Sequence, residues 1–397
     1  MLISATIKTL RSVRLPTLPT PRPLTASRLT LPIIRSLATS VETIKTTEAG
    51  AVTGTLLKGI DGKAAYATSL REIPPFPYAN LLKKGPFGDF RDELAKDGVT
   101  VVKNAIPRER ALEYRDEAFK WLEAWPFGFK RDDPSTWNND HLPIQQPNRP
   151  GMYDAYGVHH EQFMWDIRTE PGVHGAFAKL WGTEELVSSF DGLTVMLPTN
   201  PKPKEMFWPH IDQSPHRRGF FVAQGLVNLN DNGPQDGGLL VMKGSSSVLE
   251  QFFDEVGRPP LPSSKIDWHL FSRDEKQWFL DHGCEWVKVC AEPGDLILWS
   301  SSTIHQNTPP QTDQPRVVSY VCMGPSHLQT SEDKAIRSMC WTLGDGTTHA
   351  PFHGVASAKV APYIRDQTGL PDREWDRRIN PVKPTKKVLQ LAGQLPY

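Results

Sequence analysis

The apolar positions divide the chain into a helical first part and a strand-rich second part. Apolar residues recur at helical spacing at 87–94, from 107 to about 123, and at 161–181, with a break near Pro171. Short apolar runs, most of them rich in β-branched residues, predict strands at 99–102, 187–197, 220–228, 239–242, 286–289, 295–300 and 317–323. Helices followed by many short strands predict a mainly β fold with flanking helices, of the β-sandwich or jelly-roll type.

Composition separates four segments. Residues 1–40 are rich in Arg, Ser and Thr and contain no acidic residue, which predicts a mitochondrial transit peptide. The alternative is a disordered basic tail on a cytoplasmic protein, because the prolines in this segment weaken an amphipathic helix. Residues 41–85 are expected to form a linker or entry loop, 86–355 the main domain, and 356–397 a C-terminal extension.

Overall charge and cysteine content exclude several classes of protein. Lys and Arg total 45 and so do Asp and Glu, so no net field attracts nucleic acid or an anionic membrane. The four cysteines form no CxxC pair, which argues against a zinc–thiolate site. No apolar run approaches the roughly 20 residues that a membrane span needs. We therefore expect a small-molecule partner, and the sequence leaves the oligomeric state open.

One tripeptide offers a pair of metal ligands. His210 and Asp212 are two residues apart, so on an extended strand both side chains leave the same face. His305 follows an apolar strand and is the best candidate for a third ligand. Two histidines and one carboxylate on one side of a metal are typical of non-haem Fe(II) oxygenases. Other histidines, among them His159, His160 and His349, are expected at the surface or as caps.

Arg316 begins the predicted strand at 317–323, after the candidate distal histidine. An arginine in an apolar strand is costly to bury without an anionic partner. Either its head lies in water at a strand edge, or it forms a bidentate salt bridge with a dicarboxylate cosubstrate. Alternation along the strand puts Val318, Tyr320 and Cys322 on the same face as Arg316. Arg217 and Arg218 are the next candidates for such an anchor.

Several stretches resemble the phytanoyl-CoA dioxygenase family, in particular its fungal members. They are Asp97-Gly98-Val99-Thr100-Val101-Val102, His210-Ile211-Asp212, Asp236-Gly237-Gly238-Leu239-Leu240-Val241-Met242-Lys243-Gly244-Ser245, and the spacing from His305 to Arg316. The resemblance implies a double-stranded β-helix (jelly roll, cupin-like), with Fe(II) held by His210, Asp212 and His305 and 2-oxoglutarate bound by Arg316. It also implies a dioxygenase that uses O2, oxidises a small organic molecule, and releases succinate and CO2.

Two positions depart from the family pattern. Asn307 stands two residues after the distal histidine, where a hydroxyl side chain commonly assists 2-oxoglutarate, and Val318 stands where a serine is common. Asn307 remains a candidate for cosubstrate contact. Gln224 and Asn228 share one face of a predicted strand and are further candidates, although hydrogen bonds between strands are an equal alternative for both.

Two other classes of protein fit the same triad. A cupin-type metal-dependent hydrolase or isomerase would use similar ligands but has no need of Arg316. A non-catalytic binding protein of the same fold is the second alternative, although such proteins usually lose a metal ligand and none is missing here.

Overall fold

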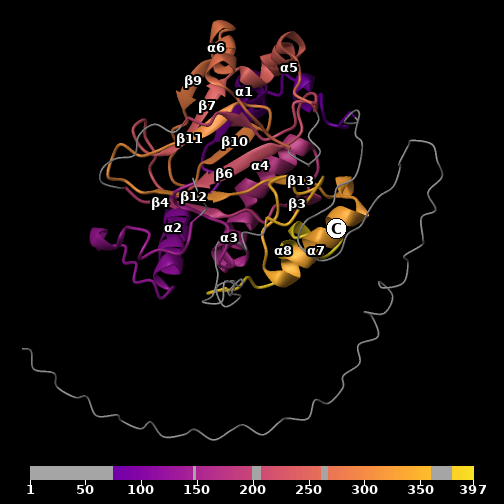
Figure 1. Ribbon diagram of the computed structural model, residues 1–397. Coiled ribbons are helices and arrows are strands. Elements are labelled where there is room, and N and C mark those ends of the chain that lie inside the picture. Colours follow the sequence, from indigo (N-terminus) through magenta and orange to yellow (C-terminus); the bar gives the residue numbers. More distant parts are fainter. Residues whose placement is uncertain (1–74, 146–148, 199–206, 261–266, 359–377) are drawn as a thin grey trace, which may run out of the picture. The chain divides into compact units, whose positions relative to one another are not determined.

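A computed structural model of the chain describes residues 75–145, 149–198, 207–260, 267–358 and 378–397. Within them, the strands form two larger antiparallel sheets and a small third one (Figure 1). The six-stranded sheet has the order β1 (Val99–Val102), β10 (Leu296–Ser300), β6 (Ala223–Asn228), β12 (Arg316–Tyr320), β4 (Leu193–Met196) and β2 (Met152–Tyr153). The five-stranded sheet has the order β8 (His269–Leu270), β5 (His210–Ile211), β11 (His305–Thr308), β7 (Gly238–Lys243) and β9 (Glu285–Lys288). β13 (Met323–Pro325) pairs with β3 (Leu186–Ser188).

The two larger sheets share an apolar interior. Leu226 and Val318 of the six-stranded sheet belong to the same buried cluster as Leu239 and Val241 of the five-stranded sheet. Alternate residues of each strand face this interior because side chains alternate between the two faces of a strand. The predicted jelly-roll fold is confirmed.

Two consecutive helices pack against the other face of the six-stranded sheet. α3 (Gln162–Thr169) ends just before Pro171, and α4 (Pro171–Trp181) begins at that proline, which suits a first helical position. α4 ends at Gly182, whose positive φ of 73° is easy only for glycine. The predicted helix at 161–181 with a break at Pro171 is therefore confirmed.

The remaining helices complete the two outer layers. α5 (Ser245–Val256) and α6 (Arg273–Asp281) bury Phe252 and Phe279 against Ile211 of the five-stranded sheet. The others are α1 (Phe90–Asp97), α2 (Arg108–Glu123), α7 (Ser331–Leu343) and α8 (Lys386–Leu391), with short 3-10 turns at η2 (Leu81–Lys84), η3 (Pro134–Thr136), η4 (Val158–His160) and η5 (Ser326–Leu328). Within the described residues, no helix combines the length and apolar character that a membrane span requires.

The structure differs from the predicted boundaries in three places. The strand predicted at 187–197 is divided between β3 and β4, and the strand predicted at 317–323 is divided between β12 and β13. Residues 75–85, expected to belong to a linker, include the buried Phe76, whose ring lies 5.0 Å from that of Phe221. The folded part therefore begins before residue 86, whereas the predicted transit peptide at 1–40 lies outside the described residues.

The C-terminal residues are bound to the main domain by buried polar groups. The Glu161 carboxylate accepts hydrogen bonds from the backbone N–H groups of Ile379 and Asn380 at 2.6 and 2.7 Å. The fully buried Arg337 donates to the carbonyls of Ser188 and Leu391 at 2.8 and 3.1 Å. Such buried bonds fix the described part of the extension on the core.

Candidate active site

Strand pairing brings three candidate metal ligands together. His210 of β5 lies directly opposite His305 of β11, and the two ring centroids are 4.2 Å apart. Asp212 follows directly after β5, and its backbone N–H donates to the Ser301 carbonyl at 2.9 Å. Its carboxylate oxygens lie 3.7 Å from Nε2 of His210 and 3.2 Å from Nε2 of His305. One ligand atom from each residue falls within 4.8 Å of the others, so a single ion can contact all three.

Backbone carbonyls orient both imidazoles. Nδ1 of His210 lies 3.1 Å from the Trp208 carbonyl, and Nδ1 of His305 lies 2.9 Å from the Thr303 carbonyl. A carbonyl can only accept, so each Nδ1 carries the proton and each Nε2 presents its lone pair to the cluster. The Trp208 ring stacks on His210 at 4.5 Å and covers its outer face. Both rings are therefore fixed in the tautomer that binds a metal.

The protonation states also suit a metal. Burial opposes ionisation of Asp212, but the two imidazoles outweigh it and hold the pKa of this carboxyl well below its usual range. Burial lowers the pKa of His305, which favours its neutral form. One carboxylate and two imidazole nitrogens give a mixed N and O donor set, which is the set that Fe(II) takes in facial triads.

Gln224 contacts one of the candidate metal ligands. Its Nε2 donates to Oδ2 of Asp212 at 2.8 Å, and the side chain lines the cavity beside the triad. The sequence predicted cosubstrate contact for Gln224 and Asn228. Asn228 instead donates from Nδ2 to the carbonyls of Asn230 and Ala291 and does not line the cavity, so its amide supports a loop. For Asn228, the alternative of an internal hydrogen bond describes the structure better.

Arg316 is buried without a partner. Its side chain is only 2% exposed, Nη1 has no hydrogen-bond acceptor, and no described residue forms an ion pair with it. Burial, together with the positive charge of Arg316, lowers the pKa of Lys288 to about 8. An unpaired buried guanidinium is expensive, so this arrangement favours an anionic ligand. Asn307 of β11 lines the cavity beside the triad, whereas Arg316 is not among the residues that line it.

The triad forms one wall of a cavity of about 320 Å³. A second group of polar residues also lines this cavity: Asp154, His159, Asp191, Thr347, Thr348 and His349. His159 is buried, which lowers its pKa to about 3, and its Nδ1 has no partner. The expectation that His159, His160 and His349 lie at the surface or act as caps is therefore wrong for His159 and His160, and His349 lines the cavity.

Sequence reasoning missed this second group because its parts come from distant segments. Asp154 follows β2, Asp191 precedes β4, and His349 follows α7. Burial raises the pKa of Asp154 to about 7, and burial also raises that of Asp191. None of the three has a local motif, and only the polar character of Asp154 and Asp191 next to predicted strands was available as a signal.

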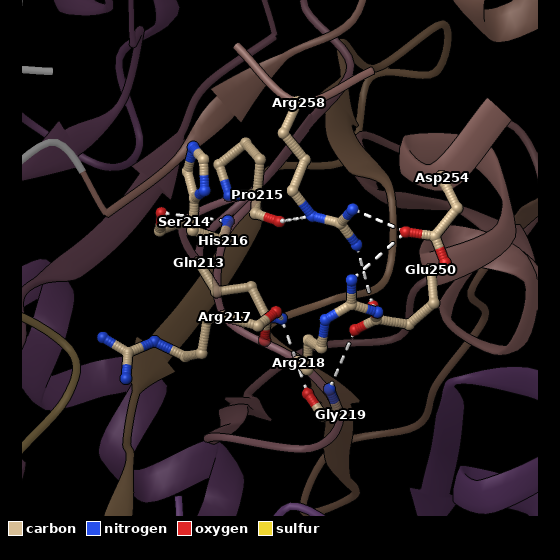
Figure 2. Close-up of polar contacts among 10 residues, drawn as sticks. All are labelled: Gln213, Ser214, Pro215, His216, Arg217, Arg218, Gly219, Glu250, Asp254 and Arg258. Atoms are coloured by element: carbon tan, nitrogen blue, oxygen red, sulfur yellow. Dashed lines mark hydrogen bonds and ion pairs between the residues drawn. The ribbon is translucent and has the colours of Figure 1, made fainter. Parts of the chain in front are cut away.

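The loop after β5, residues 213–219, is joined to α5 and the residues just after it by ion pairs (Figure 2). Arg218 pairs with Glu250 and Asp254 at 2.7 and 3.2 Å, and Arg258 pairs with the same carboxylates at 3.0 and 2.6 Å. Arg217 pairs with Asp267 at 3.0 Å. These ion pairs already neutralise Arg217 and Arg218, so Arg316 is the better candidate for binding an anionic cosubstrate.

The jelly roll and the buried His-Asp-His cluster together define the class of non-haem iron enzymes that depend on 2-oxoglutarate. The sequence model of the phytanoyl-CoA dioxygenase (PhyH) family matches residues 94–318, more than half of the chain. The chain belongs to this family.

Several known proteins are similar to this chain. A protein of Aspergillus versicolor, Ava biosynthesis cluster protein O, is 40% identical over 276 residues, which cover 68% of this chain and 89% of that protein. The structure of SnoN, a non-haem α-ketoglutarate-dependent epimerase from nogalamycin biosynthesis, has a TM-score of 0.42 at 18% identity and covers 59% of this chain and 81% of its own. EctD from S. alaskensis, solved with 2-oxoglutarate and 5-hydroxyectoine, has a TM-score of 0.40 at 17% identity, covering 59% and 75%.

Proposed function

We propose that this enzyme is a dioxygenase that oxidises a small organic molecule, with release of succinate and CO2 from 2-oxoglutarate. The observation that carries the proposal is Arg316, whose buried guanidinium has no partner among the described residues. A dicarboxylate cosubstrate supplies the missing anion, with bidentate geometry available at the guanidinium. A cupin-type hydrolase or isomerase has no use for such a charge.

The residues of the chain bind and orient the reactants. His210, Asp212 and His305 would hold Fe(II), and Arg316 would hold the distal carboxylate of 2-oxoglutarate, with Asn307 beside it. Bound iron and 2-oxoglutarate supply the oxidising chemistry with O2. Trp208 and Trp299 line the same cavity and exclude water from one side of the triad.

The relative from Aspergillus versicolor supports a small-molecule substrate. Its name assigns it to a biosynthesis cluster, and it shares 40% identity with this chain. The cavity of about 320 Å³ is of a size that suits a small ligand rather than a polymer. We therefore infer a substrate of low molecular mass from a biosynthetic route.

Consumption of 2-oxoglutarate tests the function. The purified protein with Fe(II) should form succinate from 2-oxoglutarate slowly by itself, and faster when a substrate is present. A hydrolase, an isomerase or a binding protein would form none. Succinate is therefore measured with and without Fe(II), using the Asp212→Ala variant as a control.

For location, we propose that residues 1–40 direct the protein to mitochondria, on the ground of their acid-free, Arg-rich composition. A fluorescent protein fused behind these residues should accumulate in mitochondria and lose the leader between about residues 36 and 45. A diffuse cytosolic signal from an unprocessed fusion would reduce the segment to a basic tail.

A further inference from the structure

Several buried polar atoms in the cavity wall have no protein partner. Trp208 and Trp299 each present an indole N–H without an acceptor, and Gln224 presents Oε1 without a donor. Buried polar atoms are rarely left without hydrogen bonds, because each such atom has lost its bonds to water without replacement. Atoms of this kind that line a cavity therefore indicate the groups that a ligand brings. The two indole N–H groups require acceptors, whereas Oε1 of Gln224 requires a donor.

The orientation of the Gln224 amide is fixed by chemistry. Nε2 of Gln224 donates to Oδ2 of Asp212 at 2.8 Å, and a carboxylate oxygen in a metal-binding position accepts hydrogen bonds, so the amide nitrogen faces Asp212. Rotating the amide would bring two oxygens together. Oε1 must therefore face away from Asp212, and it remains a buried acceptor on a side chain only 6% exposed.

2-Oxoglutarate cannot satisfy this acceptor. As a dianion with a keto group it has only acceptor atoms, so it suits the indole N–H groups and Arg316 but not Oε1 of Gln224. The strand register places Gln224 opposite Trp299 in the β6–β10 pair, beside the triad rather than at the Arg316 end. The partner of Oε1 must come from another molecule that sits next to the metal ligands.

We propose that Gln224 Oε1 accepts a hydrogen bond from the substrate, and that the substrate carries an O–H or N–H group close to the carbon that is oxidised. This inference rests on the proposed function, because it places the substrate beside the iron ligands. Gln224 then holds Asp212 with its nitrogen and the substrate with its oxygen. It is a specificity-determining residue for molecules with a neutral donor next to the reacting carbon.

Matched pairs of aromatic probes test the proposal. Each pair differs only by a methyl group that removes the donor: 2-quinolone and N-methyl-2-quinolone, indole and N-methylindole, 1-naphthol and 1-methoxynaphthalene. Binding is measured by calorimetry on the full chain loaded with Ni(II) and 2-oxoglutarate, which does not turn over. In at least one pair the member with the donor should bind roughly three- to tenfold more tightly, as a neutral hydrogen bond to a buried acceptor allows.

The Gln224→Met variant assigns the preference to the residue. Methionine has a similar volume but no amide, so the ratio of affinities within that pair should fall to about one. Any general loss of affinity through Asp212 cancels in the ratio. Gln251→Met, which changes an exposed glutamine of α5, is the matched control and should keep the wild-type ratio.

Two results would overturn the proposal. One is that the wild-type protein binds both members of every pair with about equal affinity, or binds all the probes only weakly. A water molecule in the cavity would then be the partner of Oε1. The other is a donor preference that survives in Gln224→Met. The proposed function is tested separately by titrating 2-oxoglutarate alone into the Ni(II) protein. If 2-oxoglutarate does not bind, that function fails, whereas binding without a donor preference removes only this inference.

Discussion

Gln224 and Asp212 are joined by a hydrogen bond of 2.8 Å between the amide nitrogen of one and a carboxylate oxygen of the other. Gln224 lies on the six-stranded sheet, whereas Asp212 follows directly after β5 of the five-stranded sheet. The bond therefore connects the two sheets at the metal site. It fixes the carboxylate that stands nearest to both imidazoles, and the predictions below start from this geometry.

Removal of a metal ligand should abolish metal binding and activity but leave the fold. In Asp212→Ala, the two imidazoles lose the only carboxylate within reach of both among the described residues. Binding of Mn(II), an air-stable substitute for Fe(II), should become undetectable by calorimetry. Succinate formation in the presence of Fe(II) should stop. An Asp212→Ala protein that still turned over 2-oxoglutarate would show that the ligand assignment is wrong.

Arg316→Leu should weaken 2-oxoglutarate binding without weakening metal binding. Loss of a charge-assisted bidentate pair costs about 2–4 kcal/mol, or roughly thirty- to thousand-fold in affinity. The same change should leave the ligand-free protein as stable as the wild type or more stable, since it removes a buried charge without a partner.

The matched control is Arg218→Leu, which removes an arginine already paired with Glu250 and Asp254. Its affinity for 2-oxoglutarate should stay at the wild-type value. If Arg316→Leu and the wild type bound 2-oxoglutarate with equal affinity, another residue would have to bind its distal carboxylate. Arg316 would then have a structural role, and Arg316→Leu should unfold at a lower temperature than the wild type without ligands.

Gln224→Met should lower metal affinity by roughly 10- to 100-fold, the usual effect of removing a partner that orients a ligand. The Asp212 carboxylate is still present in this variant, but its side chain can rotate more freely without the hydrogen bond from Gln224. Mn(II) titration measures the change, and high metal concentration should restore metal occupancy. A metal affinity equal to that of the wild type would mean that the strand alone holds Asp212.

Asp154 should make stability fall with rising pH. Burial raises the pKa of this carboxyl from 3.8 to about 7 in the folded state. Between these two values the unfolded chain has released the proton and the folded chain has kept it, so the folded state loses relative stability as pH rises through this window. Above about pH 7 the loss is complete.

The Asp154→Asn variant checks this effect, because its amide does not titrate. The difference in unfolding temperature, variant minus wild type, should grow from pH 4 to pH 7 and stay constant above it. Other titrating groups are common to both proteins and cancel. A difference that does not change with pH would show that Asp154 keeps its ordinary pKa.

Local pattern was enough to predict the fold class and the residues that form the triad. The two-residue spacing of His210 and Asp212 predicted that both side chains leave the chain in the same direction. Alternation after Arg316 predicted one face for Val318, Tyr320 and Cys322; Tyr320 and Cys322 line the cavity, whereas Val318 lies in the buried apolar cluster between the sheets. These features depend on the period of one strand. A shift of one residue would reverse every side chain, so the apolar pattern determines them strongly.

Features that depend on distant segments could not be predicted. Gln224 received its partner from the other sheet, and Asn228 was turned toward a loop although it shares a face with Gln224. The His159 ring lies against Gly346, where an added Cβ would come within 2.5 Å of its Nε2, so this packing needs a glycine far along the chain. Spacing within one strand carries no information about such contacts, because chain topology decides them.

The wall formed by Thr347, Thr348 and His349 has an evolutionary consequence. It lies beyond residue 318, where the family match ends, and it is held by its own bonds, such as that from the Phe190 N–H to Thr347 Oγ1 at 2.9 Å. Inheritance can therefore alter this short stretch while the iron-binding strands stay unchanged. Relatives that differ in this stretch would be expected to accept different substrates with the same metal site. Exchanging the stretch between relatives is therefore a direct way to change the substrate that the enzyme accepts.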